Sequence, residues 1–402
     1  MRAKRLIYIV DDQEAILSLI LMILQANSEW QGRGFINPKE AFEAVKAEPP
    51  DLIISDQCMP EMYGSELLEL ARNVSPDTVR IIMSGYIHPA DLSQITVAHQ
   101  YILKPFTIDR ITSLIARTCE ARDSVTDLAL RRTITSLRTL PAMPHAYKEL
   151  VSEIDQPCCS IERIAQLIAN DPSISAKVLQ MANSALYRRA SAIATPLEAV
   201  LCLGTETVKA IVISQQLFQQ FGDLDVPDLS VPQIWNHSWD AAYCARHLCL
   251  LQGTAKIEEA FLAGLLHDLG KLVFMDNFPA QYRTACEAAR RKSQPLSEAE
   301  REVFQASHTE VGGYLLHLWA MPEDVIEAVI HQNHPTQSNH SEFSALTALY
   351  AGNIISRKLH PPDPFVTPEW DMSYLESIGC QNCVKEWEES CASLLRKNRT
   401  RD

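Results

Sequence analysis

The sequence predicts an α/β domain with a parallel sheet, followed by an all-α domain. Over residues 1–120, short apolar runs alternate with helical patterns, as in parallel strands that are joined by helices. From residue 137 onward, apolar residues recur at helical spacing. The pairs Asp171-Pro172 and Thr195-Pro196 each place a capping residue before a proline, which is typical of a helix start.

Polar residues stand at the ends of the four apolar runs of the first domain. The runs are 5–10, 51–55, 79–85 and 100–106, and the polar groups at their ends are Asp11, Asp12, Asp56, Ser84 and Lys104. Because the carboxyl ends of parallel strands share one edge of a sheet, we expect these groups to meet there.

This set of residues indicates phosphoryl chemistry. Three carboxylates at one point repel one another unless a hard cation lies among them, and Mg²⁺ prefers oxygen ligands. One carboxylate can then attack a phosphoryl group while Mg²⁺ and a lysine neutralise the charge on its oxygens. A hydroxyl group would donate one further hydrogen bond.

Residues 1–120 resemble the receiver domain of two-component response regulators. The matching motifs are VDD (10–12), SDQCMP (55–60) with Gly64, MSG (83–85) and YILKPF (101–106). The resemblance implies a flavodoxin-like fold with a five-stranded parallel sheet. It also implies that Asp56 accepts phosphate from a sensor histidine kinase.

The resemblance also implies roles for the surrounding residues. The expected Mg²⁺ ligands are Asp11, Asp12, Asp56 and the backbone carbonyl of Cys58. Ser84 and Lys104 would contact the phosphoryl group, and Tyr101 would swing inward when Ser84 moves toward it. The Lys104–Pro105 bond is expected to be cis, since cis bonds are essentially confined to proline.

Residues 107–137 contain neither Gly nor Pro, which predicts that the last receiver helix continues toward the next domain. We assign 121–136 as a linker helix. Its polar middle makes an isolated helix marginal. Two interpretations stay open at this point: a homodimer contact through the linker helix, and a solvated connector.

Residues 137–336 resemble the HDOD domain, a relative of the HD and HD-GYP phosphohydrolases. Matching stretches include LPAMPHAYKELVSEI (140–154), IANDPSISAKVLQMANSALY (168–187) and AFLAGLLHDLGKL (260–272). Active relatives gather His and Asp ligands around metal ions. The candidates for such a site here are His237, His267, Asp268, His308, and His331 or His334.

This set of ligands is incomplete. Active relatives carry an Asp on a later helix, where this chain has Gly352-Asn353, and two adjacent histidines, where it has His331-Gln332. The Asp-Gly-x-Gly-Tyr-Pro loop is absent. We therefore expect no hydrolase activity and no bound transition metal, with His267 and Asp268 as a buried hydrogen-bonded pair. The alternative is a receiver-regulated, metal-dependent phosphodiesterase that acts on a cyclic nucleotide or dinucleotide.

The net charge and the lengths of the apolar runs indicate which kinds of partner to expect. The net charge of −14 argues against DNA binding, so we expect the output to be a protein–protein contact with an unidentified signalling protein. No apolar run reaches membrane-spanning length, and we expect a cytoplasmic protein with no membrane partner. Residues 337–402 read as a C-terminal helical extension without chemistry.

Eleven cysteines without framework spacing predict mostly reduced thiols in a cytosolic chain. The stretch CQNC (380–383) with Cys391 suggests zinc, but no nearby fourth ligand completes a tetrahedral set. Small buried thiols are the simpler interpretation.

Overall fold

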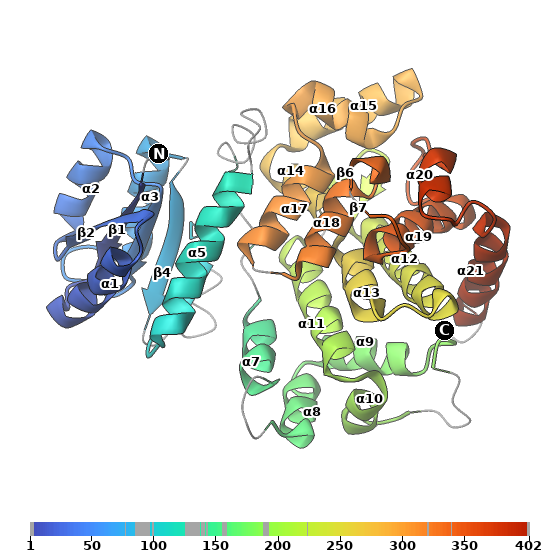
Figure 1. Cartoon of the computed structure of the whole chain (residues 1–402), viewed down its shortest axis with the longest axis horizontal. Coiled ribbons are helices and arrows are strands. Elements are labelled where there is room, and N and C mark those ends of the chain that lie inside the picture. Colours follow the sequence, from blue (N-terminus) through green and yellow to red (C-terminus); the bar gives the residue numbers. More distant parts are fainter. Residues whose placement is uncertain are drawn as a thin grey trace. The chain divides into compact units, whose positions relative to one another are not determined.

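The computed structural model describes residues 4–76, 78–84, 97–98, 100–124, 137, 141, 144–154, 159–187, 193–222, 224–319, 321–338 and 340–399. The chain forms two compact units, 1–142 with 317–320, and 143–316 with 321–402. The first contains a parallel sheet, and the second is almost entirely helical (Figure 1). The predicted fold class is therefore confirmed.

One parallel sheet organises the first unit. Its strands are β1 (Arg5–Val10), β2 (Trp30–Phe35), β3 (Leu52–Asp56), β4 (Val79–Ser84) and β5 (Gln100–Leu103). They lie in the order β2-β1-β3-β4-β5. The strand order reverses at β1, which is where α/β sheets collect functional groups outside the carboxyl ends of the strands.

Strand β2 is the one that the apolar pattern did not identify. Its sequence, WQGRGF, lies at the sheet edge and is fully buried only at its two ends. A Cβ atom on Gly32 would lie 2.7 Å from Leu24 Cδ1, and one on Gly34 would lie 2.8 Å from Leu21 Cδ1. The two glycines thus allow helix α1 (Glu14–Ala26) to approach the strand closely.

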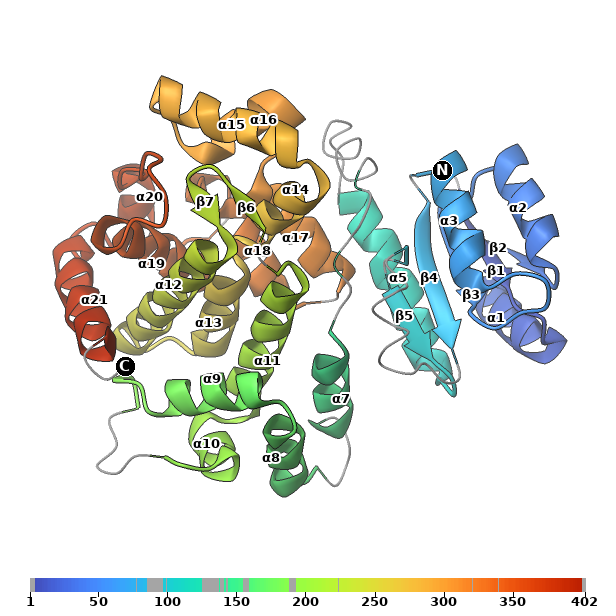
Figure 2. The ribbon, with the colours of Figure 1, turned by 180° about the vertical axis from the view of Figure 1, so that it is seen from behind.

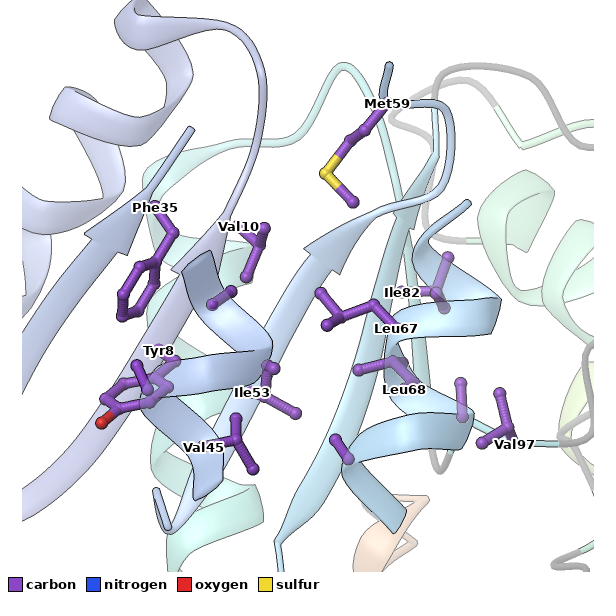
Figure 3. Packing of buried hydrophobic residues seen from close by; sticks show 14 residues of the cluster. Tyr8, Val10, Phe35, Val45, Ile53, Met59, Leu67, Leu68, Ile82 and Val97 are labelled. Carbon is purple, nitrogen blue, oxygen red and sulfur yellow. The ribbon is translucent and has the colours of Figure 1, made fainter. Parts of the chain in front are cut away.

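The other helices of this unit are α2 (Pro38–Ala47), α3 (Gly64–Val74) and α5 (Ile108–Ser124). Figure 3 shows the core that the sheet forms with α2 and α3. Tyr8 and Ile53 from the strands pack there with Val45, Leu67 and Leu68 from the helices, and all five are fully buried. Burying an aliphatic side chain of this size contributes about 1.5–3 kcal/mol, so this core fixes the helices to the sheet.

The predicted linker falls mostly outside the described residues. Helix α5 runs to Ser124, as the Gly- and Pro-free sequence predicts. Residues 125–136 lie outside the described part of the chain. The linker helix and its homodimer contact therefore stay predictions.

The second unit is a stack of helices. They are α7 (His145–Ile154), α8 (Ile161–Ala169), α9 (Pro172–Ala182), α10 (Pro196–Leu203), α11 (Thr205–Gln220), α12 (Val231–Gln252), α13 (Ile257–Leu266), α14 (Leu269–Asn277), α15 (Pro279–Lys292), α16 (Leu296–Phe304), α17 (His308–Leu318), α18 (Glu323–His331), α19 (Ala345–Leu359), α20 (Met372–Ser377) and α21 (Val384–Arg399). Helices α12, α13 and α19 pack against one another (Figure 2). A two-stranded hairpin of β6 (Asp225–Val226) and β7 (Leu229–Ser230) precedes α12.

Side-chain caps begin several of these helices where the sequence predicted them. Asp171 accepts hydrogen bonds from the backbone N–H groups of Ser173 and Ile174 before α9. Thr195 and Glu198 form a reciprocal capping box at the start of α10. Each cap satisfies donors that the first helical turn leaves unpaired, which stabilises the helix by about 1 kcal/mol.

Residues 337–402 belong to the second unit. Helix α19 packs on α12 and α18, and α21 packs on α12 and α19. Trp387 and Cys391 of α21 are fully buried. No helix in the described part of the chain is long and apolar enough to cross a membrane.

Candidate functional site

The carboxyl edge of the sheet carries an acidic cluster. Asp11 follows β1, Asp56 ends β3 and Lys104 follows β5, and both carboxylates are buried. Lys104 Nζ donates to Asp11 Oδ2 at 2.7 Å and also to Asp56 Oδ1. The Lys104–Pro105 bond is cis, which confirms that prediction. The sheet thus brings together groups that are up to 93 residues apart in the sequence.

Backbone contacts hold the two carboxylates in place. The N–H of Cys58 donates to Asp56 Oδ2 at 2.8 Å, and the N–H of Gln13 donates to Asp11 Oδ1 at 2.9 Å. A Cβ atom on Gly64 would lie 2.1 Å from the Asp56 carbonyl oxygen. Only glycine therefore lets α3 begin so close to the end of β3.

The charges of this cluster do not balance. Burial raises the pKa of Asp56, although the hydrogen bond and charge of Lys104 act in the opposite direction. Burial alone would lower the pKa of Lys104, but its hydrogen bonds to Asp11 and Asp56 outweigh burial and raise it. Asp12 directly follows Asp11, so three carboxylates lie at this edge with the single ammonium of Lys104 and outnumber it.

A divalent cation fits this imbalance. Asp12 Oδ1 is buried and has no hydrogen-bond partner among the described residues. An unpaired buried carboxylate oxygen is costly, and Mg²⁺ takes such oxygens as ligands. Asp11, Asp12, Asp56 and the carbonyl of Cys58 are the groups at this edge that would hold it.

Of the remaining predicted receiver residues, Ser84 lies at this edge. Ser84 is buried at the end of β4 and pairs with Leu103 of β5. Tyr101 lies in β5 opposite Ile82, and only its backbone belongs to the described structure.

A second cluster lies within the helical unit. His237 projects from α12, while His267 and Asp268 occupy the junction of α13 and α14. All three are buried, and one ligand atom of each lies within 4.8 Å of the others. The structure thus brings together three of the predicted metal-ligating residues.

Asp268 is the charged centre of this cluster. Lys271 Nζ donates to its Oδ2 at 2.7 Å, and His267 Nε2 and His308 Nε2 lie 3.4 Å and 3.5 Å from its oxygens. Burial by itself would raise the pKa of Asp268, but the neighbouring His267 and Lys271 hold it well below its ordinary value. The carboxylate is therefore ionised.

Burial favours the neutral form of the two central imidazoles. Burial lowers the pKa of His267, and burial lowers that of His237 further. His267 Nδ1 lies 2.8 Å from the Gly264 carbonyl oxygen, to which it must donate. Its Nε2 atom consequently carries a lone pair, and that atom has no hydrogen-bond partner in the described structure.

Glu300 holds His308 in the cluster, and the sequence pattern did not point to it. The buried Glu300 carboxylate accepts from His308 Nδ1 at 2.6 Å, from the His308 backbone N–H at 2.7 Å and from the Tyr282 hydroxyl at 2.8 Å. These bonds turn His308 Nε2 toward Asp268. A Glu within a charged helix is not distinguishable by sequence from a surface Glu. The contact of Glu300 with His308 depends on how α16 lies against α17, which only the structure shows.

Two amides complete the cluster. Asn353 Oδ1 lies 3.0 Å from His237 Nε2, and Asn353 Nδ2 donates to Gln332 Oε1 at 2.9 Å. Gln332 Nε2 donates in turn to the His267 carbonyl oxygen at 3.0 Å. Of the pair Gly352-Asn353, Asn353 therefore reaches the site. Gly352 serves packing, since a Cβ there would lie 2.8 Å from the Ala241 carbonyl oxygen.

His331 and His334 lie outside this compact triad. His331 ends α18 and is half-buried, and its Nδ1 has no partner in the described part of the chain. His334 Nε2 lies 3.4 Å from Arg301 Nη1. The cavity of about 30 Å³ beside Asp268 is lined by Gln332 and Asn353, and by neither histidine.

The close approach of α14 to α17 gives a testable prediction. A Cβ atom on Gly270 would lie 2.0 Å from the His308 carbonyl oxygen, whereas the nearest atom to a Cβ on Gly312 would be 3.4 Å away. We expect Gly270→Ala to lower the free energy of unfolding by about 1–3 kcal/mol. Gly312→Ala is the matched control and should leave it almost unchanged. Thermal unfolding of both variants checks this, and equal stability would show that α14 can shift without cost.

Family models match both units of the chain. The response regulator receiver domain matches residues 7–116, and the HDOD domain matches residues 140–335. The chain is similar to the crystal structure of an HDOD domain protein of unknown function from Geobacter sulfurreducens. That likeness has a TM-score of 0.54 and 21% identity, and covers 68% of this chain and 95% of the other. At this identity it shows the fold alone.

Two curated relatives match part of the chain. An uncharacterized protein of Treponema pallidum (strain Nichols) is 26% identical over 234 residues, which are 57% of this chain and 44% of the relative. The DNA-binding transcriptional regulator NtrC of Proteus hauseri is 32% identical over 119 residues, 28% of this chain and 24% of that protein. The chain thus spans less than half the length of either relative.

The fold and these matches define a receiver domain followed by an HDOD domain. The first is the receiver domain that response regulators carry, and the second is the HDOD domain.

Proposed function

We propose that Asp56 accepts a phosphoryl group from a sensor histidine kinase and that the HDOD domain passes the signal on through a protein–protein contact. The observation that carries the first part is the contact of one ammonium, Lys104, with two buried carboxylates from different strands. Such an arrangement is unfavourable for structure alone, because negative charge is left without a counter-ion.

The chemistry of the transfer follows from these contacts. An Asp56 oxygen attacks the phosphorus atom, and the bond from phosphorus to the imidazole nitrogen of the kinase breaks. The Cys58 N–H holds the other Asp56 oxygen, which orients the carboxylate. Lys104 would then donate to a phosphoryl oxygen, and bound Mg²⁺ supplies the further positive charge. Ser84, at the end of β4, would donate a hydrogen bond to the new phosphoryl group, and Tyr101 of β5 would swing inward when Ser84 moves.

The closed amide network supports a non-catalytic output domain. His237 Nε2 is engaged by Asn353, so it could serve as a metal ligand only if that hydrogen bond were lost. Lys271 already neutralises Asp268. Leu197 and Leu201 of α10 are exposed, and α10 packs on α8, where Ile161 is also exposed. Apolar side chains on neighbouring helices suit contact with another protein.

The competing function is a metal-dependent phosphodiesterase. The observation in its favour is the unpaired His267 Nε2 beside the Asp268 carboxylate, since a lone pair and a carboxylate facing one point are what a metal ion requires. Metal analysis separates the two functions. A hydrolase should copurify with stoichiometric Fe, Mn or Zn, whereas the signalling function needs none at this site.

DNA binding has little support. The NtrC match covers 28% of this chain and 24% of that protein. The net charge of −14 also disfavours a phosphate backbone as the partner.

Asp12→Ala is expected to abolish Mg²⁺ binding at the acidic edge and, with it, phosphorylation of Asp56. The reason is that the unpaired Asp12 oxygen is offered to the cation, and without the cation the phosphoryl charge would meet the remaining carboxylates. Mg²⁺ titration and labelling with a small phosphodonor check this. Glu14→Ala, close in sequence but on an exposed side chain of α1, is the control. Normal labelling of Asp12→Ala in Mg²⁺ would show that the cation binds elsewhere.

A further inference from the structure

The short connection between α20 and α21 carries two cysteines. Helix α20 ends at Ser377, and Gly379 beyond it has a φ of 72°. The Cys380 N–H donates to the Leu375 carbonyl at 2.7 Å. Cys383 stands directly before α21, and its carbonyl accepts from the Trp387 N–H at 2.9 Å in the first turn. Cys380 and Cys383 thus mark the two ends of one tight corner.

The geometry of this corner brings the two thiols together. The Cys383 N–H donates to the Cys380 carbonyl at 3.0 Å, which makes residues 380–383 a β-turn. The end Cα atoms of such a turn lie within about 7 Å, and a disulfide requires about 4.4–6.8 Å. Burial, and then the charge and hydrogen bond of the neighbouring Cys383, raise the pKa of the Cys380 thiol.

Zinc does not account for this pair. Cys391, which the sequence placed beside it, instead forms a hydrogen bond with Cys244 of α12, and both of these thiols are fully buried. Within the described residues, the group of His, Cys, Asp or Glu side chains with metal-binding spacing is His237, His267 and Asp268. Cys380 and Cys383 therefore lack the third and fourth ligands of a tetrahedral site.

We propose that Cys380 and Cys383 form a thiol–disulfide site, which is oxidised by a small-molecule or protein disulfide. Cys383 is partly exposed, whereas Cys380 is buried, so Cys383 is the residue that such an oxidant reaches first. Access and thiolate formation decide which cysteine reacts.

The exchange takes place in two balanced steps. The Cys383 thiolate attacks one sulfur of the oxidant, whose S–S bond breaks and releases one thiolate, and a mixed disulfide forms. The Cys380 thiolate then attacks the Cys383 sulfur and expels the second thiolate. The two cysteines lose two electrons and two protons, and the oxidant gains two electrons and becomes two thiols.

Oxidation would act on the corner and not on global stability. A ring closed over four residues removes little entropy from the unfolded chain, since this stabilisation grows with loop length. The new bond would instead restrain the corner from which α21 runs back against α12 and α19. We expect slower amide hydrogen exchange in α20 and the first turn of α21 in the oxidised protein.

The test is a redox titration of the full chain in glutathione buffers of graded composition, followed by acid quench, alkylation and peptide mass mapping. We expect the peptide that contains both cysteines to lose two hydrogen atoms in one two-electron transition. Cys383→Ser should abolish this change, and Cys380→Ser should stop at a glutathione adduct on Cys383. Cys391→Ser, which removes a thiol outside the corner, should retain the transition.

Wild-type protein gives the primary result, because serine at the buried position 380 can itself disturb folding. Two outcomes would overturn the proposal. One is a glutathione adduct that persists on wild-type Cys383 without resolving to the internal disulfide. The other is full alkylation of both thiols after treatment with excess oxidised glutathione, which would show that both had stayed reduced. A copurifying metal ion that keeps them reduced would give this same result and would also overturn the proposal.

Discussion

Asp56→Asn is expected to remove all phosphorylation of this protein. With Mg²⁺ and a small phosphodonor, the wild-type chain should gain a base-labile phosphate, and the variant should show none. Asparagine keeps the size of the side chain and can keep the contact with the Cys58 N–H, but its amide is not a nucleophile for phosphorus. The loss would therefore report chemistry and not misfolding.

Asp109→Asn is the matched control for this experiment, because Asp109 is an exposed carboxylate at the start of α5 in the same domain. Its labelling should equal that of the wild type, and all three proteins should melt at similar temperatures. Equal labelling of Asp56→Asn would mean that another residue accepts the phosphate. The proposed role of the acidic edge would then have to be abandoned.

His267→Ala is expected to cause a large loss of stability in the second unit. Because we propose that this unit has no hydrolase activity, the substitution should change stability and not catalysis. His267 is fully buried, donates to the Gly264 carbonyl and packs edge-on against His237 with ring centroids 5.1 Å apart. Removing it leaves a cavity and an unpaired carbonyl, with a cost of about 2–4 kcal/mol. For a unit of this size we expect the melting temperature to fall by about 5–15 °C.

The wild-type protein, supplied with Mn²⁺ or Fe²⁺, should leave cyclic dinucleotides intact whether or not it is phosphorylated. A catalytic metal centre needs ligands that fix the ion and partners that orient them, and loss of one partner commonly costs about 10- to 100-fold. In this chain, Asn353 stands where the resemblance places an Asp in active relatives, and Gln332 stands where it places a second histidine.

His340→Ala is the control for the stability measurement. His340 forms a partly exposed pair with Glu327, and such surface pairs contribute about 0–1 kcal/mol. Multi-turnover cleavage that disappears in His267→Ala would establish the phosphodiesterase instead. A melting temperature unchanged by His267→Ala would show that the cluster does not stabilise the fold.

Much of the fold followed from local pattern. The runs at 5–10, 51–55 and 79–85 are apolar because both faces of a central parallel strand are covered, so the sequence predicted them as strands. Strand β2 was not, because its edge position and its two glycines give it no apolar run. Its pairing with β1 depends on the packing of α1, which a local pattern does not express.

The acidic edge was predictable for a related reason. Parallel strands end at one edge, so Asp11, Asp56 and Lys104 had to be neighbours once the strands were assigned. Their roles with Mg²⁺ and phosphate stay predictions, as do those of Ser84 and Tyr101. The pairing of Lys104 with both carboxylates is a tertiary result, because it depends on how far its side chain reaches across the sheet.

For the histidine–aspartate cluster, local sequence patterns predicted some of the residues but not their contacts. Sequence alone indicated that His267 and Asp268 are a buried pair among apolar residues, and that the set of ligands departs from that of active relatives. The junction of α13 and α14 at this pair is a result of the structure. Tertiary structure decided that Asn353 and not Gly352 faces His237, and that Glu300 orients His308. Neighbouring residues on a helix point about 100° apart, so which of them enters a site depends on how the helices are rotated and how closely they pack. That rotation is set by contacts between residues distant in the chain, such as Gly352 against Ala241 and Gly270 against His308.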